Sequence, residues 1–227
     1  MGVVIPIVLF AALVALVLVA PRFAPFRGRM RAGTIARELT TGQGFEPRGD
    51  FALDRFPTAG PPFHYGGAKR LDAQVAGAVD GLTTVSAGYR CRENGSTHFY
   101  GVVLVSLPAP VARIEVRHEP AFHSVRVVEP VPGGLASTGI TPFDERYRTY
   151  VAEPLTVGTL LPDAAVRALL AAPEPCSWRA EGRELLLWRS GGWSCAEALL
   201  ASLRAATGAL RPEVDRAAGC QAAGPTQ

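Results

Sequence analysis

Five consecutive strand-like segments lie within residues 72–128, and this feature constrains the fold of the chain more than any other. Segments 82–91 and 111–118 alternate apolar and polar side chains, which is the pattern of half-buried strands. The five segments cover residues 75–79, 82–91, 98–107, 111–118 and 124–128. Asp80-Gly81 and Asn94-Gly95 are residue pairs typical of two-residue hairpin turns. Consecutive strands joined by tight turns predict an antiparallel meander.

The remaining segments predict helices and further strands without a regular alternation of the two. They are a strand at 146–152, a helix at 162–172, a hairpin with arms 177–180 and 184–189, and a helix at 194–208. Without strand–helix–strand alternation, we do not predict a parallel doubly wound sheet. We therefore predict one α+β domain over residues 45–208, with a mainly antiparallel sheet of about six to eight strands and two helices on one face. Residues 209–227 have no apolar period and are predicted to be a frayed tail.

An apolar segment at residues 3–20 contains no charged side chain. As a helix it would be about 27 Å long, close to the thickness of the hydrocarbon core of a bilayer. We predict that residues 1–21 form a transmembrane helix that anchors the soluble domain. The alternative is a cleaved signal peptide followed by an exported domain, but such peptides carry positive charge before the apolar segment. Only Met1 and Gly2 precede it here.

Basic side chains follow the apolar segment and define a juxtamembrane segment at residues 22–44. They are Arg22, Arg27, Arg29, Arg31 and Arg37. Because basic residues that flank a span stay in the cytoplasm, we predict a single-pass protein of the cell membrane with its N-terminus outside and its domain cytoplasmic. The same arginines would attract anionic lipid. The whole chain has a net charge of only +3, and we expect no nucleic-acid partner.

Ser194 and Cys195 lie between a predicted strand and a predicted helix, where the nucleophile of a hydrolase would lie. In that fold the catalytic His follows the nucleophile, whereas all four His residues of this chain precede Ser194. Ser194 and Glu197 instead fit a capping box at the start of the helix. We therefore assign no catalytic residue.

A hydrolase remains the alternative, with a site built from His98, His118 or His123 and acids such as Glu119. His118 and His123 are five residues apart, which does not fit the i, i+4 spacing of a zincin helix. The cysteines at 91, 176, 195 and 220 lack metal-ligand spacing, and no glycine-rich segment continues into a phosphate loop. We expect neither a metal nor a cofactor. The cysteines stay reduced in a cytoplasmic domain, whereas Cys176 and Cys195 are the first candidates to pair in an exported one.

Three segments resemble a group of single-pass membrane proteins of unknown function from GC-rich bacteria. They are the run from Thr141 to Tyr147, the leucine-rich segment 160–170 and the run from Glu184 to Trp188. The predominance of Arg over Lys is also typical of GC-rich genomes. The resemblance implies an architecture and carries no catalytic motif. Our expectation is a membrane-anchored, non-enzymatic module that binds or scaffolds a partner protein or lipid.

Overall fold

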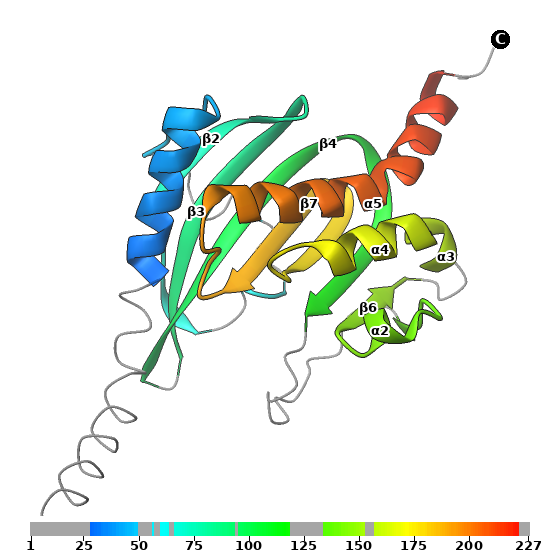
Figure 1. Cartoon of the computed structure of the whole chain (residues 1–227), viewed down its shortest axis with the longest axis horizontal. Helices are drawn as coiled ribbons and strands as arrows, with labels where there is room; N and C mark the ends of the chain where they lie inside the picture. Colours follow the sequence, from blue (N-terminus) through cyan, green and yellow to red (C-terminus); the bar gives the residue numbers. More distant parts are fainter. Residues whose placement is uncertain are drawn as a thin grey trace, which may run out of the picture.

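The computed structural model describes residues 28–49, 56, 60–63, 66–93, 95–118, 134–152 and 157–222 (Figure 1). The strands are β1 (Glu46–Pro47), β2 (Gly67–Val79), β3 (Leu82–Glu93), β4 (Ser96–His118), β5 (Gly134–Ala136), β6 (Tyr147–Val151) and β7 (Ser177–Ser190). A helix over residues 28–42, here called the N-terminal helix, precedes them. The other helices are α2 (Thr141–Asp144), α3 (Val157–Leu160), α4 (Asp163–Ala171) and α5 (Ala196–Ala222).

The strands form a seven-stranded sheet in which every pair is antiparallel. Its order is β1-β2-β3-β4-β6-β5, and β7 pairs with β4. The meander β2-β3-β4 confirms the prediction for this part of the chain. Asp80 and Gly81 both have positive φ, at 50° and 81°, as a type I′ turn between two twisted strands requires. The α+β class with a mainly antiparallel sheet is therefore correct.

β4 and β7 are each a single long strand, where the sequence predicted two segments apiece. The hairpin predicted around Gly182 is wrong, because β7 runs through that position. Pairing passes from Ser106–Glu184 to Val111–Gly182, so β4 carries three more residues than β7 across this gap. Pro108 and Pro110 lack the N–H groups that a regular ladder would need there. The irregular segments of β4 and β7 lie opposite each other. Both strands therefore continue beyond the irregularity and remain paired.

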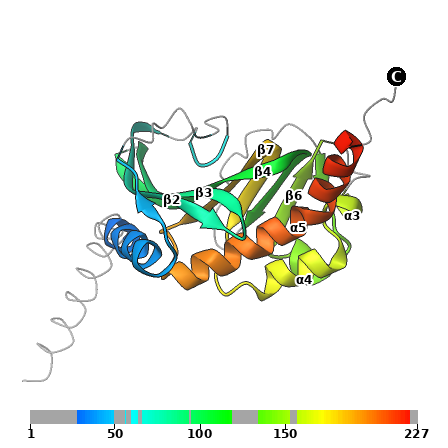
Figure 2. The ribbon, with the colours of Figure 1, turned by 90° about the horizontal axis from the view of Figure 1, so that it is seen from above.

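The helices cover one face of the sheet (Figure 2). The N-terminal helix, α4 and α5 all contribute buried side chains to one core cluster, through residues such as Leu39, Val166 and Leu203. The same cluster includes Val103 of β4 and Leu187 of β7. Two helices were expected on this face, and the N-terminal helix adds a third. It was assigned to the juxtamembrane segment, yet Ile35 and Leu39 belong to the core of the domain.

The opposite face of the sheet carries a second, smaller core cluster. Phe56 and Phe63 come from residues 42–68, a segment rich in Gly and Pro, and the Phe63 ring meets Tyr89 of β3 edge-on at 4.7 Å between centroids. Phe45 of the same segment is also buried, although it lies in the larger cluster. Aromatic side chains therefore tie this segment to both faces of the domain.

Helix α5 extends fourteen residues beyond its predicted end near Gly208, to Ala222. Ala209 and Leu210 are buried, so the segment predicted as a frayed tail is helical and packed in this region. Pro212 lies inside the helix, and Figure 1 shows α5 changing direction along its length. A proline removes one backbone hydrogen bond and clashes with the preceding turn, which bends a helix rather than ending it when packing holds both halves.

None of the helices in the described part of the chain is long and apolar enough to cross a membrane. The apolar segment 3–20, the predicted strand 124–128 and Asn94 lie outside the described residues.

Candidate functional site

The N-terminal helix is seated on the sheet through glycines that let it approach closely. A Cβ atom at Gly28 would lie 2.3 Å from Cδ1 of Phe99, and one at Gly88 would lie 2.8 Å from Cζ of the same ring. The Phe99 ring therefore fills the space that these two glycines leave. Further along the helix, Ile35 and Leu39 are buried. The chain thus enters the domain at a tightly packed position beside β3 and β4.

The start of α5 is held by two carboxylates from distant parts of the chain. The backbone N–H of Ala196 donates a hydrogen bond to Oε2 of Glu38 at 2.7 Å. The backbone N–H of Ser194 donates to both oxygens of Glu174, at 3.1 and 3.2 Å. Free N–H groups and the helix dipole make such an end a favourable place for negative charge. Glu38 therefore joins the N-terminal helix to the start of α5.

Ser194 does not act as the cap that its sequence motif predicted. The helix begins at Ala196, so Ser194 lies two residues before it. Among the described residues, its hydroxyl contacts Sγ of Cys195, at 3.8 Å. The prediction of a capping box is wrong because carboxylates from elsewhere in the fold take the positions near the helix start. No local sequence signal distinguishes Glu38 from any other helical glutamate.

Three of the five arginines singled out from the sequence are described, and all three lie on the N-terminal helix. Arg29, Arg31 and Arg37 are exposed. No ion pair joins their side chains to another residue in the described part of the chain. Arg22 and Arg27 lie outside the described residues. From residue 28 onward, these arginines therefore lie on a helix that the domain holds in place.

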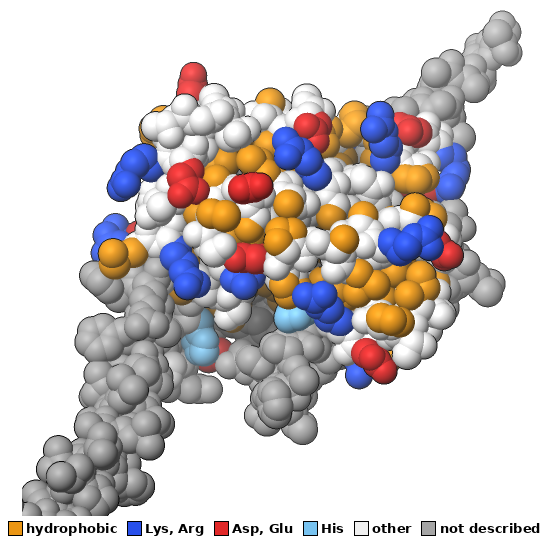
Figure 3. Space-filling view, in the orientation of Figure 1, with side chains coloured by type: hydrophobic (Ala, Val, Ile, Leu, Met, Phe, Trp, Pro, Cys, Tyr) orange, Lys and Arg blue, Asp and Glu red, His pale blue; other side chains and the backbone are white. Residues whose placement is uncertain are grey.

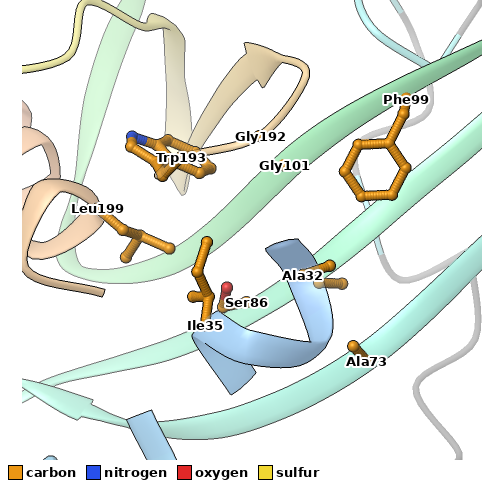
Figure 4. A pocket seen from close by; sticks show the side chains of 10 residues that line it. Ala32, Ile35, Ala73, Ser86, Phe99, Gly101, Gly192, Trp193 and Leu199 are labelled. Carbon is orange, nitrogen blue, oxygen red and sulfur yellow. The ribbon is translucent and has the colours of Figure 1, made fainter. Parts of the chain in front are cut away.

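A small pocket lies beneath the N-terminal helix (Figure 4). Ala32 and Ile35 of the helix, Phe99 of β4 and Trp193 line it together with Leu199 of α5. Ser86 supplies the polar side chain that the figure shows at its wall. An apolar lining with a single hydroxyl offers no acid–base pair. The pocket marks the junction of the helix, the sheet and the start of α5.

His98 and His118 lie at the two ends of β4 and have different neighbours. Nε2 of His98 is 3.9 Å from Oε2 of Glu93, whereas the His118 ring packs against Tyr147 at 5.6 Å between centroids. His123 and Glu119, the other members of the alternative hydrolase site, lie outside the described residues. Among the residues that are described, no three His, Cys, Asp or Glu side chains group so that they could hold a metal ion.

The described cysteines are Cys91, Cys176 and Cys195, and no disulfide joins any two of these three. Cys176 is buried beside α5, and its burial raises the pKa of the thiol to about 12, against the smaller opposing effect of a hydrogen bond with Ser202. A thiol with so high a pKa stays protonated at neutral pH and is a poor nucleophile. Cys176 therefore has the properties of a structural residue.

No family model matches the chain, and no curated protein matches it in sequence. One solved structure with a similar fold is the crystal structure of the mycobacterial trehalose monomycolate transport factor A, TtfA. The TM-score is 0.56, and the match covers 81% of this chain and 93% of the other at 14% sequence identity. The likeness is one of fold: both chains share this arrangement of sheet and helices.

Proposed function

We propose that the chain is a single-pass membrane protein whose α+β domain is a non-enzymatic binding module in the cytoplasm. Residues 1–21 would be the anchor, and the domain would bind a partner protein at the membrane. The observation that carries this proposal is the position of Gly28, where the chain is already packed against Phe99. Only residues 21–27 separate the apolar segment from this contact, and seven residues span at most about 25 Å. A domain so connected would be confined to the membrane surface.

The orientation follows from the arginines. Arg22 and Arg27 lie between the apolar segment and the domain, and Arg29, Arg31 and Arg37 continue the positive charge along an exposed helix surface. Positive charge after a first span favours retention of that side in the cytoplasm. The thiols of Cys176 and Cys195, which form no disulfide with each other, are compatible with a reducing compartment.

The surroundings of the titratable side chains support a binding role over an enzymatic one. His98 and His118 have separate neighbours, and the thiol of Cys176 is held protonated by burial. The pocket beneath the N-terminal helix is lined mainly by apolar groups. These features favour a module that acts through its surface.

A topology experiment tests the proposal. A reporter that is active only in the cytoplasm, fused after Gln227, should be active, and the protein should stay in the membrane after alkaline carbonate extraction. A variant with two lysines inserted after Met1, combined with Arg22→Gln and Arg27→Gln, should reverse the orientation and silence the reporter. An N-terminus cleaved near residue 21 in the mature protein would instead establish the exported domain and refute the proposal.

A further inference from the structure

Basic side chains from three separate segments meet at the end of the domain where the chain enters it. We call this surface the basic end; its residues are Arg29, Arg31, Lys69, Arg70, Arg90 and Arg92. The first two come from the start of the N-terminal helix, the next two from the start of β2, and the last two from the end of β3. Figure 3 shows blue side chains at the left of the molecule, near the place where the N-terminal helix begins.

The strand register fixes these segments side by side. Arg70 lies opposite Arg90 across β2 and β3, and Gly67 lies opposite Arg92. Arg90 in turn lies opposite Phe99 across β3 and β4, and Gly28 packs on the Phe99 ring. The start of the N-terminal helix is therefore held beside the basic ends of β2 and β3.

The acids described at this end are fewer than the bases. Asp72 is within 3.4 Å of Arg70 and 3.6 Å of Arg90, and its side chain is only 9% exposed, whereas that of Arg70 is 66% exposed. Glu93 lies near His98. Six basic side chains thus face two described carboxylates, so the surface presents net positive charge. Neighbouring like charges destabilise a sheet, and a sheet that carries them at one end gains from an external anionic partner.

An exposed apolar side chain lies within the same surface. Met30, between Arg29 and Arg31, is 60% exposed, and among the described large hydrophobic residues only Leu135 shares that property. An apolar group flanked by basic groups matches the boundary between lipid headgroups and acyl chains. An acidic protein surface or a free anion would explain the charges but not the exposed methionine.

We propose that the basic end is a docking surface for anionic lipid, through which the domain lies directly on the bilayer that residues 3–20 enter. The proposal rests on the membrane anchoring proposed above and adds a defined contact face. Arg29, Arg31, Arg70 and Arg92 contact lipid phosphates, and Met30 enters the headgroup layer. The domain is then held in one orientation, with α4 directed away from the basic end and open to a protein partner.

Hydrogen exchange of the full chain in lipid nanodiscs tests this face. Nanodiscs of phosphatidylcholine are compared with nanodiscs in which about a third of the lipid is phosphatidylglycerol, enough to give the surface a negative potential. We expect slower amide exchange at residues 28–32, 67–70 and 90–97 in the anionic nanodiscs, and unchanged exchange in α4 and β6. Salt at about 0.5 M should remove this difference, because exposed charges are screened within a few ångströms at that concentration.

Two double variants with the same change in net charge distinguish an effect of the basic end from an effect of net charge alone. Arg70→Gln with Arg92→Gln should lose the lipid-dependent protection. Arg167→Gln with Arg211→Gln removes two exposed charges of α4 and α5 and should keep it; these arginines are 70% and 82% exposed. Loss of protection in both variants, or equal protection in both kinds of nanodisc, would overturn the docking face.

The same samples also test the membrane anchoring independently of the docking surface. If the chain enters nanodiscs and resists carbonate but shows no anionic-lipid effect, the docking surface fails and the anchor stands. If the chain does not enter nanodiscs of either composition, the proposed function fails, and the docking surface fails with it.

Discussion

The Glu38 carboxylate accepts a 2.7 Å hydrogen bond from the backbone N–H of Ala196, 158 residues further along the chain. The contact caps α5 and at the same time fixes the N-terminal helix to it. A charge-assisted hydrogen bond of this kind contributes more than a neutral one, because the carboxylate also meets the positive end of the helix dipole.

Replacing Glu38 with Ala should lower the free energy of unfolding by about 1.5–3 kcal/mol, the usual contribution of a hydrogen bond to a charged group. Glu197→Ala is the control: Glu197 lies in the first turn of α5 and is exposed, so only a dipole effect of about 0.3–1 kcal/mol is lost. Urea unfolding followed by tryptophan fluorescence measures both, since buried Trp193 lies three residues before Ala196. Equal losses in the two variants would contradict the cap.

Replacing Ser194 with Ala should change the free energy of unfolding by less than about 0.5 kcal/mol, because its exposed hydroxyl caps no backbone group among the described residues. Glu174→Ala should cost about 1–2 kcal/mol, since the Ser194 N–H and Arg189 both lose their carboxylate partner. The same unfolding measurement compares them. A larger loss for Ser194→Ala than for Glu174→Ala would restore the capping box as the correct interpretation.

Two glycines of the N-terminal helix should respond in opposite directions to alanine. Gly28→Ala places a methyl group 2.3 Å from the Phe99 ring and should destabilise the domain by about 1–3 kcal/mol. Gly33→Ala meets no atom within 4 Å and should stabilise the helix by about 0.5–1 kcal/mol. Thermal unfolding of the two variants tests the docked position of the helix. Stabilisation by both would mean that Gly28 does not pack on the sheet.

Asp144 should make the stability of the domain depend on pH. Burial alone would raise the pKa of its carboxyl, but hydrogen bonds from Ser137 and Thr138 outweigh burial and lower it. The ionised form is therefore favoured in the folded state, so its contribution is full above about pH 4 and is lost as the pH falls through the lowered folded pKa. The difference in stability between the wild type and Asp144→Asn should shrink over that acidic range. A difference that stays constant down to pH 2 would contradict this assignment.

The sequence predicted the β2-β3-β4 meander because strands and tight turns are specified by residues close together in the chain. Alternating side chains in β3 and the Asp80-Gly81 turn specify strands and their reversal within a few residues. The same local signals wrongly predicted a hairpin around Gly182, where β7 is one continuous strand. Glycine and proline mark both turns and irregular strand pairs, and the outcome depends on the partner strand, which the sequence does not place.

The candidate site depended on contacts between distant segments. Arg29 and Arg31 stand out in the sequence because they follow an apolar segment, whereas each of Lys69, Arg70, Arg90 and Arg92 is ordinary in its own strand. Strand register brings them beside the N-terminal helix. Likewise, α5 continues past Gly208 and Pro212 because Ala209 and Leu210 have a core to pack against, and tertiary burial overrides weak helix propensity.

The bond between Glu38 and Ala196 has a consequence for the order in which the protein is made. The N-terminal helix leaves the ribosome early, but Ala196, whose N–H donates to Glu38, and the α5 side chains that share a core cluster with Leu39 are synthesised late. Until then the helix has only part of its final surroundings. The domain therefore closes late, and a nascent chain interrupted before residue 196 leaves the Glu38 carboxylate without this backbone partner.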